Sequence, residues 1–371
     1  MPYFTALPPS TPSTSSCKIV QDRHDLEGII GGRDDLSSEV PVTFKKLIND
    51  PFDVVDEALD GFVYAHSSLI ALHEPRVVVR RSPAGSKVGI VVGGGSGHEP
   101  AFGGYVGLGM ADAAACGNIF ASPPPNVILS AIRAANHGHG VLMAYGNYAG
   151  DVMNFGLAAQ LAAAEGIEVR EVRVSDDVAS APKGEESKRR GIAGDIIVFK
   201  CAGAAAEGGR PLAEVERIAR DANDWTRSMG VALSACEVPG SGRPTFELPD
   251  DQMEIGMGVH GEPGIKRGPL RPADEVAGVL VDTILADVES LRGDVALLVN
   301  GLGATAYVDQ HILFRAARRA LEARGLNVVR GYVGEFITSL EMAGASVTVT
   351  FLHDELLALL DAPASAPAFR N

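Results

Sequence analysis

Short apolar runs rich in β-branched residues alternate along the chain with segments whose apolar residues recur at helical spacing. The apolar runs predict buried strands at 76–81, 87–92, 140–144, 168–174, 231–236, 254–259, 295–299, 328–333 and 346–351. The helical spacing predicts helices at 126–136, 152–165, 196–207, 211–229, 272–292 and 307–323, and two short helices on either side of Pro51. This alternation is typical of an α/β protein whose mostly parallel or mixed sheets are flanked by helices.

Chain length and one polar run predict two such α/β domains. At roughly 150 residues per domain, the 371 residues are enough for two hydrophobic cores. The run 183–190 is polar and charged, so we place a domain boundary there, with a first domain at 42–185 and a second at 186–371. Residues 1–41 lack periodicity and are rich in turn-forming residues, which predicts a disordered N-terminal extension.

Charge and cysteine usage exclude several classes of function. The net charge of −15 argues against nonspecific binding to nucleic acid or to an anionic membrane. The 4 cysteines lie far apart, as in a reducing compartment and unlike a disulfide framework or a zinc site. Because neither a membrane-spanning apolar run nor a secretory signal is visible, we expect a cytoplasmic protein.

Several common cofactor and nucleophile motifs are missing from the chain. There is no GxxxxGK[ST] loop for a nucleoside triphosphate, and a GxGxxG reading fails because Pro100 occupies the last glycine position. No HExxH motif or close Cys/His cluster occurs, so we expect no metal on this chain. The segment around Ser96 is one residue short of the hydrolase elbow, which disfavours a serine hydrolase.

The glycine-rich segment 93–97, which follows the apolar run 88–92 and precedes His98, is the strongest local signal of a binding site. Consecutive glycines predict a sharp turn at which a ligand can approach backbone N–H groups. The end of a strand is also where a doubly wound sheet binds its ligand. The alternative is a tight turn with a merely exposed His98, and this loop alone does not define the chemistry.

Two further polar residues stand at the ends of predicted strands. Asp151 begins a predicted helix, where a plain capping role would explain it. His260 lies in a glycine-rich loop, where a structural role and a functional role are equally supported. We interpret His137 and His139, at the end of a helix, as partners of the helix dipole.

Six segments, taken together and in this order, resemble the substrate-binding (K) subunit of dihydroxyacetone kinases. The resemblance extends from about Phe44 to Phe351 and includes several long motifs, so it is specific. The segments are KKLINDP at 45–51, GGGSGHEP at 93–100, GNYAGDVMNF at 146–155, RRG at 189–191, GAAAE at 203–207 and GVHGEPG at 258–264.

The resemblance implies a homodimer that holds a small ketose covalently, as a hemiaminal on His260. It implies that His98 acts as a proton acceptor and that Asp151 is the base or orienting group for the hydroxyl that attacks phosphorus. The substrate-binding residues that it implies are Gly95, Ser96, Gly97, His98, Gly146, Asp151 and His260.

The resemblance also implies a division of labour between two parts. In this family, the nucleotide and its magnesium ion lie on a separate helical (L) domain or subunit. Too little chain follows Phe351 to form such a domain, and the sequence has no phosphate-binding loop of its own. We therefore expect ATP or ADP with Mg²⁺ to bind a partner L subunit, and no cofactor to bind this chain. The sequence does not determine whether the phosphoryl donor is ATP or a phosphotransferase-system protein.

One departure from the family pattern bears on the substrate. The dihydroxyacetone enzymes commonly have a lysine where this chain has Gly146. The extra space and the lost cation favour a larger ketose, such as a tetrulose of the erythrulose type, as an alternative to dihydroxyacetone.

Two other functions are alternatives to a kinase subunit. A ketose-sensing transcriptional coactivator of the same family needs capture by His260 but neither His98 nor Asp151, so the presence of all three favours the enzyme. An isomerase or aldolase would need a Schiff-base lysine, and neither Lys183 nor Lys200 has a persuasive sequence setting.

Overall fold

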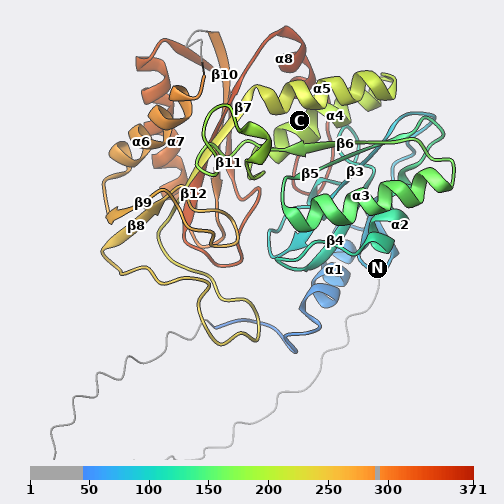
Figure 1. Ribbon diagram of the computed structural model, residues 1–371, viewed down its shortest axis with the longest axis horizontal. Coiled ribbons are helices and arrows are strands. Elements are labelled where there is room, and N and C mark those ends of the chain that lie inside the picture. Colours follow the sequence, from blue (N-terminus) through green and yellow to red (C-terminus); the bar gives the residue numbers. More distant parts are fainter. Residues whose placement is uncertain (1–44, 289–292) are drawn as a thin grey trace, which may run out of the picture. The chain divides into compact units, whose positions relative to one another are not determined.

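The computed structural model describes residues 45–288 and 293–371, so the predicted extension at 1–41 lies outside the described residues. The described chain contains two mixed sheets of 6 strands each, one from each half of the sequence, with helices packed against them (Figure 1). The predicted α/β class with two mixed sheets is therefore confirmed.

The first sheet has the strand order β1-β2-β4-β3-β5-β6. Its strands are β1 (Ile70–Glu74), β2 (Val77–Arg80), β3 (Gly89–Ser96), β4 (Ala113–Ile119), β5 (Val141–Gly146) and β6 (Val169–Val174). The last four are parallel, and β1 and β2 are antiparallel to their neighbours. Since β4 and β5 lie on opposite sides of β3, the chain reverses its direction across the sheet there, which places a ligand crevice at the carboxyl end of β3.

Helices cover both faces of the first sheet. Val91 and Met143 point toward α2 and α3, whereas their neighbours Ile90 and Leu142 point toward α4 and α5, as strand alternation requires. The helices of this half are α1 (Val54–Ala65), α2 (Pro125–Ala135), α3 (Ala149–Ala164), α4 (Asp195–Glu207) and α5 (Leu212–Asp224), with short 3₁₀ turns at Gly103–Tyr105 and Glu186–Lys188. A parallel sheet buried on both faces explains why its strands read as continuous apolar runs.

The second sheet has the strand order β11-β10-β12-β7-β8-β9, in which β10 and β11 are parallel and the other pairs antiparallel. Its strands are β7 (Thr226–Ala232), β8 (Gln252–Ile255), β9 (Lys266–Pro269), β10 (Gly293–Gly301), β11 (Leu326–Gly334) and β12 (Gly344–Phe351). The helices α6 (Ala273–Ala286) and α7 (Tyr307–Ala323) pack on one face, and α8 (Asp354–Asp361) packs against α4.

The other face of the second sheet belongs to the same hydrophobic cluster as the first sheet. Ala296 and Leu298 of β10 share this cluster with Ile90 of β3 and Phe199 of α4. Both α4 and α5, which follow the boundary predicted near residue 185, pack against the first sheet. The division into domains at that position stays a prediction.

Several predicted elements differ from the structure. Residues 45–50 form no helix, and Phe44 lies outside the described residues. The helix predicted at 211–229 ends at Asp224, because its apolar spacing stops there and the next residues form the buried strand β7 beside β12. Strands β1, β4 and β9 were not predicted. In β4 the reason is composition, since Ala113–Ile119 is rich in alanine and has one β-branched residue.

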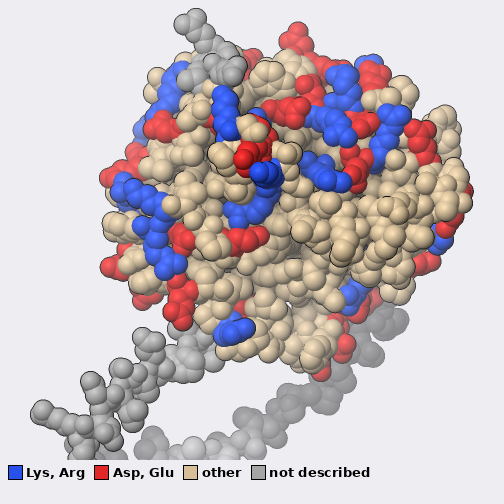
Figure 2. All heavy atoms as spheres, in the orientation of Figure 1, with Lys and Arg blue, Asp and Glu red and all other residues tan. Residues whose placement is uncertain are grey.

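One face of the molecule has both charged and uncharged regions. Basic side chains are interspersed with acidic ones there, and a broad uncharged area covers the region of α3 (Figure 2). Met153, Leu157 and Leu161 are exposed on this helix. No helix among the described residues is long and apolar enough to span a bilayer.

Candidate active site

The glycines after the first apolar run continue strand β3 instead of forming the predicted turn. A β carbon on Gly93 would overlap the Ala115 backbone in β4, and one on Gly94 would overlap the Phe102 ring. The glycines are therefore required by close packing on both sides of the strand. The chain turns only at Gly97, whose φ of +95° is readily adopted by glycine.

That turn places His98 in a buried and fixed position. Its Nδ1 lies 2.7 Å from the carbonyl oxygen of Thr338, so Nδ1 carries the proton and donates it. Its ring stacks on Phe120 with centroids 4.9 Å apart. Burial, with a smaller contribution from the nearby His260, lowers the pKa of His98 to about 3. His98 is thus a neutral imidazole at pH 7, with the Nε2 lone pair available.

His260 approaches the same point from the loop between β8 and β9. Its Nδ1 lies 3.1 Å from a carboxylate oxygen of Glu262, and its backbone N–H donates to the other oxygen at 2.9 Å. Burial raises the pKa of Glu262, but the hydrogen bond and charge of His260 outweigh burial and lower it to about 2. Ionised Glu262 therefore accepts the Nδ1 proton of His260, which directs Nε2 away from it.

The two imidazoles meet through their Nε2 atoms, 3.0 Å apart. Both Nδ1 atoms are committed as donors, so two neutral rings would bring two lone pairs into contact. A proton placed between the two Nε2 atoms would remove this repulsion, and the Glu262 carboxylate, 3.1 Å from His260 Nδ1, lies where it can compensate the added charge. The pair can therefore pass a proton from one ring to the other and expose a nucleophilic nitrogen on His260.

Asp151 is the third predicted residue at this point. It lies in the first turn of α3 but does not cap the helix, because the N-cap residue is Tyr148 and no side chain caps the helix. The capping alternative is therefore wrong. Asp151 is 8% exposed, its Oδ1 has no hydrogen-bond partner among the described residues, and burial raises its pKa to about 6. Such a carboxylate is a stronger base than an exposed one.

These side chains line one small cavity at the carboxyl ends of β3 and β5. Its lining residues are Gly94, Gly95, His98, Phe102, Gly146, Tyr148, Asp151, Gly191, Asp195, Val259, His260 and Ile337. Its volume of about 20 Å³ is close to that of one water molecule. A ketose therefore fits only if side chains that line the cavity move.

Two of the predicted binding residues do not line this cavity. The hydroxyl of Ser96 is buried and donates to the carbonyl oxygen of Gly117 at 2.8 Å, which ties β3 to β4. Gly97 forms the turn before His98. The structure thus brings together Gly95, His98, Gly146, Asp151 and His260, and a binding role for Ser96 and Gly97 stays a prediction.

Comparison with known proteins gives the family. Residues 60–368 match the family model of the Dak1 domain. This chain belongs to the Dak1 domain family. The resemblance to dihydroxyacetone kinases in the sequence is therefore confirmed.

Individual relatives of this Dak1 domain include stand-alone subunits and longer chains. It is 44% identical to the PTS-dependent dihydroxyacetone kinase 2, dihydroxyacetone-binding subunit DhaK of Listeria innocua, covering 88% of this chain and 99% of that subunit. It is 47% identical to L-erythrulose 1-kinase of Mycolicibacterium smegmatis, over 88% of this chain but only 58% of that protein. The chain thus spans little more than half the length of the erythrulose kinases that it matches.

A solved structure, a dihydroxyacetone kinase operon co-activator named Dha-DhaQ, has the same fold. It superposes with a TM-score of 0.80 at 34% identity, covering 84% of this chain and 97% of that chain. The fold of the Dak1 domain is therefore found in a protein named as an operon co-activator as well as in proteins named as kinases.

Three functional candidates in the Dak1 domain were not singled out from the sequence. Glu262 follows His260 by two residues within the quoted GVHGEPG motif, so its position could have signalled a partner for the imidazole. Arg190 forms an ion pair with Asp177 at 2.8 Å and lies 3.7 Å from Glu262, which anchors the Glu262 carboxylate. Asp195 opens α4, and nothing in its local sequence indicates that it borders the cavity.

Lys200 is not placed to act as the Schiff-base lysine that an isomerase or aldolase would need. Its ammonium group donates to the carbonyl oxygen of Leu359 in α8 at 2.5 Å, and burial lowers its pKa to about 8. Neither Lys200 nor Lys183 lines the cavity. This agrees with the sequence-based preference for a kinase subunit.

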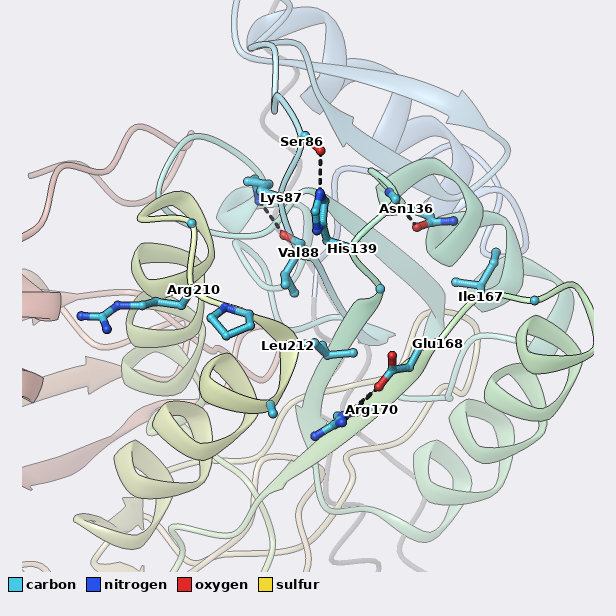
Figure 3. Close-up of a pocket in the computed structure, with 16 residues that line it drawn as sticks. Ser86, Lys87, Val88, Asn136, His139, Ile167, Glu168, Arg170, Arg210 and Leu212 are labelled. Atoms are coloured by element: carbon cyan, nitrogen blue, oxygen red, sulfur yellow. Dashed lines mark hydrogen bonds and ion pairs between the residues drawn. The ribbon is translucent and has the colours of Figure 1, made fainter.

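A larger hollow of about 650 Å³ lies at the opposite, amino-terminal ends of β3, β5 and β6 (Figure 3). It shares no lining residue with the small cavity. His139 contacts the Ser86 hydroxyl there at 2.6 Å, and His137 lies 3.6 Å from Asp112. These partners lie outside α2, and the interaction of both histidines with the helix dipole stays a prediction.

Proposed function

We propose that this Dak1 domain is the substrate-binding part of a ketose kinase. It holds a short-chain ketose as a hemiaminal on His260 while a nucleotide-binding partner phosphorylates the terminal hydroxyl. The observation that supports this most is the Nε2 contact at 3.0 Å between His260 and His98, with Asp151 lining the same cavity. The names of the relatives, which include an erythrulose kinase and a dihydroxyacetone-binding subunit, support the same chemistry.

The imidazole pair can form the hemiaminal with all protons accounted for. His98 Nε2 accepts the shared proton, which frees the lone pair on His260 Nε2. That lone pair attacks the carbonyl carbon, a C–N bond forms and the C=O π bond breaks. The resulting oxyanion takes the proton back from His98, and the positive charge stays on the substituted His260 ring beside ionised Glu262.

Asp151 then acts on the ketose that the adduct holds in place. Its Oδ1 accepts the proton of the terminal hydroxyl while the hydroxyl oxygen bonds to the transferred phosphoryl group. Fixing the ketose at its carbonyl carbon replaces a mobile substrate by an oriented one, which lowers the entropic part of the barrier. Polyols without a carbonyl cannot form the adduct and are rejected.

The remaining assignments are part of the same proposal. ATP or ADP with Mg²⁺ binds a separate helical L domain or subunit, this chain forms a homodimer, and the complex works in the cytoplasm. Among the described residues, no group of His, Cys, Asp or Glu is arranged to hold a metal ion. The residues described here bind and orient the ketose, and the partner supplies the phosphoryl group.

Intact-mass spectrometry tests the covalent step. Incubation with dihydroxyacetone or erythrulose should add the mass of one intact ketose per chain, since a hemiaminal forms without loss of water. The His260→Ala variant should show no adduct, and His311→Ala, which removes an exposed histidine on α7, should retain it. An unchanged adduct in His260→Ala would exclude His260 as the nucleophile.

A ketose sensor is the second candidate, and the structural likeness to the Dha-DhaQ co-activator favours it. A sensor needs only reversible capture, whereas the buried Asp151, whose pKa is raised by burial to about 6, is also suited to accept the proton of a hydroxyl. Supplying the purified chain with a nucleotide-binding partner subunit and following phosphorylated ketose separates the two. Product formation supports the kinase, and adduct formation without any product supports the sensor.

A further inference from the structure

A second buried carboxylate, that of Asp195, borders the cavity beside Gly146. Asp195 is 2% exposed and opens α4. A β carbon on Gly191 would lie 2.6 Å from Gly146 Cα and 2.9 Å from Asp195 Oδ1. The two glycines therefore pack backbone against backbone, and this contact leaves room for the Asp195 carboxyl group next to Gly146.

The position of Asp195 is fixed by the loop that precedes it. Asp176, which follows β6, accepts the backbone N–H groups of Ile192 and Gly194, each at 2.8 Å. Asp176 is completely buried, and a β carbon on Gly194 would overlap its carboxylate. The start of α4 therefore has little freedom, and Asp195 is held where it lies.

Despite this ordered setting, Asp195 Oδ1 has no hydrogen-bond partner among the described residues. Two other residues that line the cavity have the same property, Asp151 at Oδ1 and Tyr148 at its hydroxyl. A buried polar atom without a partner costs on the order of 1–3 kcal/mol, so three of them around one cavity need an explanation. A ligand with several hydroxyl groups supplies one.

The protonation of Asp195 suits such a ligand. Burial, and then the negative charges of Asp176 and Asp151, raise the pKa of Asp195 well above its ordinary value. A protonated carboxyl group both donates and accepts a hydrogen bond, so it can pair with a neutral hydroxyl without burying an isolated charge.

We propose that Asp195 is a specificity-determining residue, which binds a hydroxyl group of a four-carbon ketose in the cavity that Asp195 and Gly146 both line. This rests on the proposed adduct at His260. A tetrulose has three hydroxyl groups for the three unpartnered groups of Asp151, Asp195 and Tyr148, whereas dihydroxyacetone has two. The carbonyl oxygen is left to His98 in both cases. A three-carbon ketose leaves one buried polar group unpaired, and an unpaired group discriminates strongly between substrates.

The test compares the affinities of adduct formation for erythrulose and for dihydroxyacetone, measured by intact mass across a concentration series. Asp195→Ala should weaken the erythrulose adduct about 10- to 100-fold and change the dihydroxyacetone adduct less than about 3-fold. Asp195→Asn keeps the shape and hydrogen-bonding ability of the side chain, so most of the erythrulose affinity should be restored. This variant also tests whether the fold tolerates a neutral side chain at position 195. The exposed Asp309→Ala on α7 is the matched control and should match the wild type for both ketoses.

The outcomes separate this inference from the function on which it rests. A loss that is equal for both ketoses, or no change for either, overturns the role of Asp195 while leaving the adduct at His260 intact. A wild-type chain that forms no adduct with either ketose overturns the proposed function and this inference with it. A selective loss for erythrulose in Asp195→Ala, with recovery in Asp195→Asn, supports the inference.

Discussion

The two imidazoles that meet in the cavity have opposite settings. His98 is 4% exposed, stacks on Phe120 and is held by a backbone carbonyl, so it is fixed and neutral. The His260 side chain is 24% exposed, lies on a loop between two short strands and is held through the ionised Glu262. The fixed ring is suited to moving a proton, and the more accessible ring beside a carboxylate is suited to forming a bond and carrying the resulting charge.

A similar contrast separates the two carboxylates Asp151 and Asp176. Both are buried at the carboxyl end of the first sheet, but Asp176 accepts two backbone N–H groups and Asp151 has an unpartnered oxygen. A carboxylate with its bonds satisfied stabilises a loop, whereas an unsatisfied one costs stability and remains available for chemistry.

The largest effect is expected for Asp151→Asn on phosphoryl transfer. With a partner subunit present, the rate should fall about 10²- to 10⁴-fold because the amide cannot accept the hydroxyl proton. The adduct at His260 should persist, because Asp151 takes no part in forming it. In the wild type, the transfer rate should rise with pH through about 6 as Asp151 ionises. Near-normal turnover in the variant, measured by product formation, would contradict the base role.

A smaller effect is expected for Glu262→Gln on adduct formation. The neutral amide no longer compensates the charge on the substituted His260 ring and no longer enforces the Nδ1 proton, so adduct affinity should fall about 10- to 100-fold. Glu247→Gln, at a residue of the 233–251 loop that does not line the cavity, is the control and should leave the affinity unchanged. Titration by intact mass measures both, and equal affinities for the two variants would remove Glu262 from the account.

A third effect concerns stability, and Asp151→Asn should increase it. Folding raises the pKa of Asp151 from 3.8 to about 6, so the folded state binds the proton more tightly and ionisation above pH 6 costs stability. The cost is absent below about pH 4 and reaches about 3 kcal/mol at pH 8. Urea unfolding should therefore show a stabilised variant at pH 8 and a difference near zero at pH 4. A variant less stable than the wild type at pH 8 would contradict the assigned burial cost.

The sequence was sufficient for three of the four parallel strands of the first sheet and for three residues that line the cavity. The apolar runs at 87–92 and 140–144 correspond to β3 and β5, and His98, Asp151 and His260 stand in glycine-rich motifs after predicted strands. Parallel strands bring such ends together at one edge of a sheet, so their meeting could be anticipated for the first half of the chain.

Other features depend on contacts that the local sequence does not carry. Consecutive glycines are compatible with either a turn or a closely packed strand. The close contacts of Gly93 with Ala115 and of Gly94 with Phe102 show that this segment is a strand. Asp195 has the local pattern of an ordinary helix start, and its place at the cavity depends on the Gly191–Gly146 contact. The contact between the two Nε2 atoms likewise depends on Glu262 and Thr338, which hold the two Nδ1 atoms from different segments of the chain.

The central claim is that His260 Nε2 forms a bond to the carbonyl carbon of a ketose. NMR with ketose labelled with ¹³C at C2 and protein labelled with ¹⁵N in histidine observes this bond directly. The carbonyl signal should be replaced by that of a tetrahedral carbon coupled to one histidine Nε2, and this signal should be missing in His260→Ala. A bound ketose whose C2 keeps its carbonyl shift, or whose coupling persists in His260→Ala, would contradict the claim.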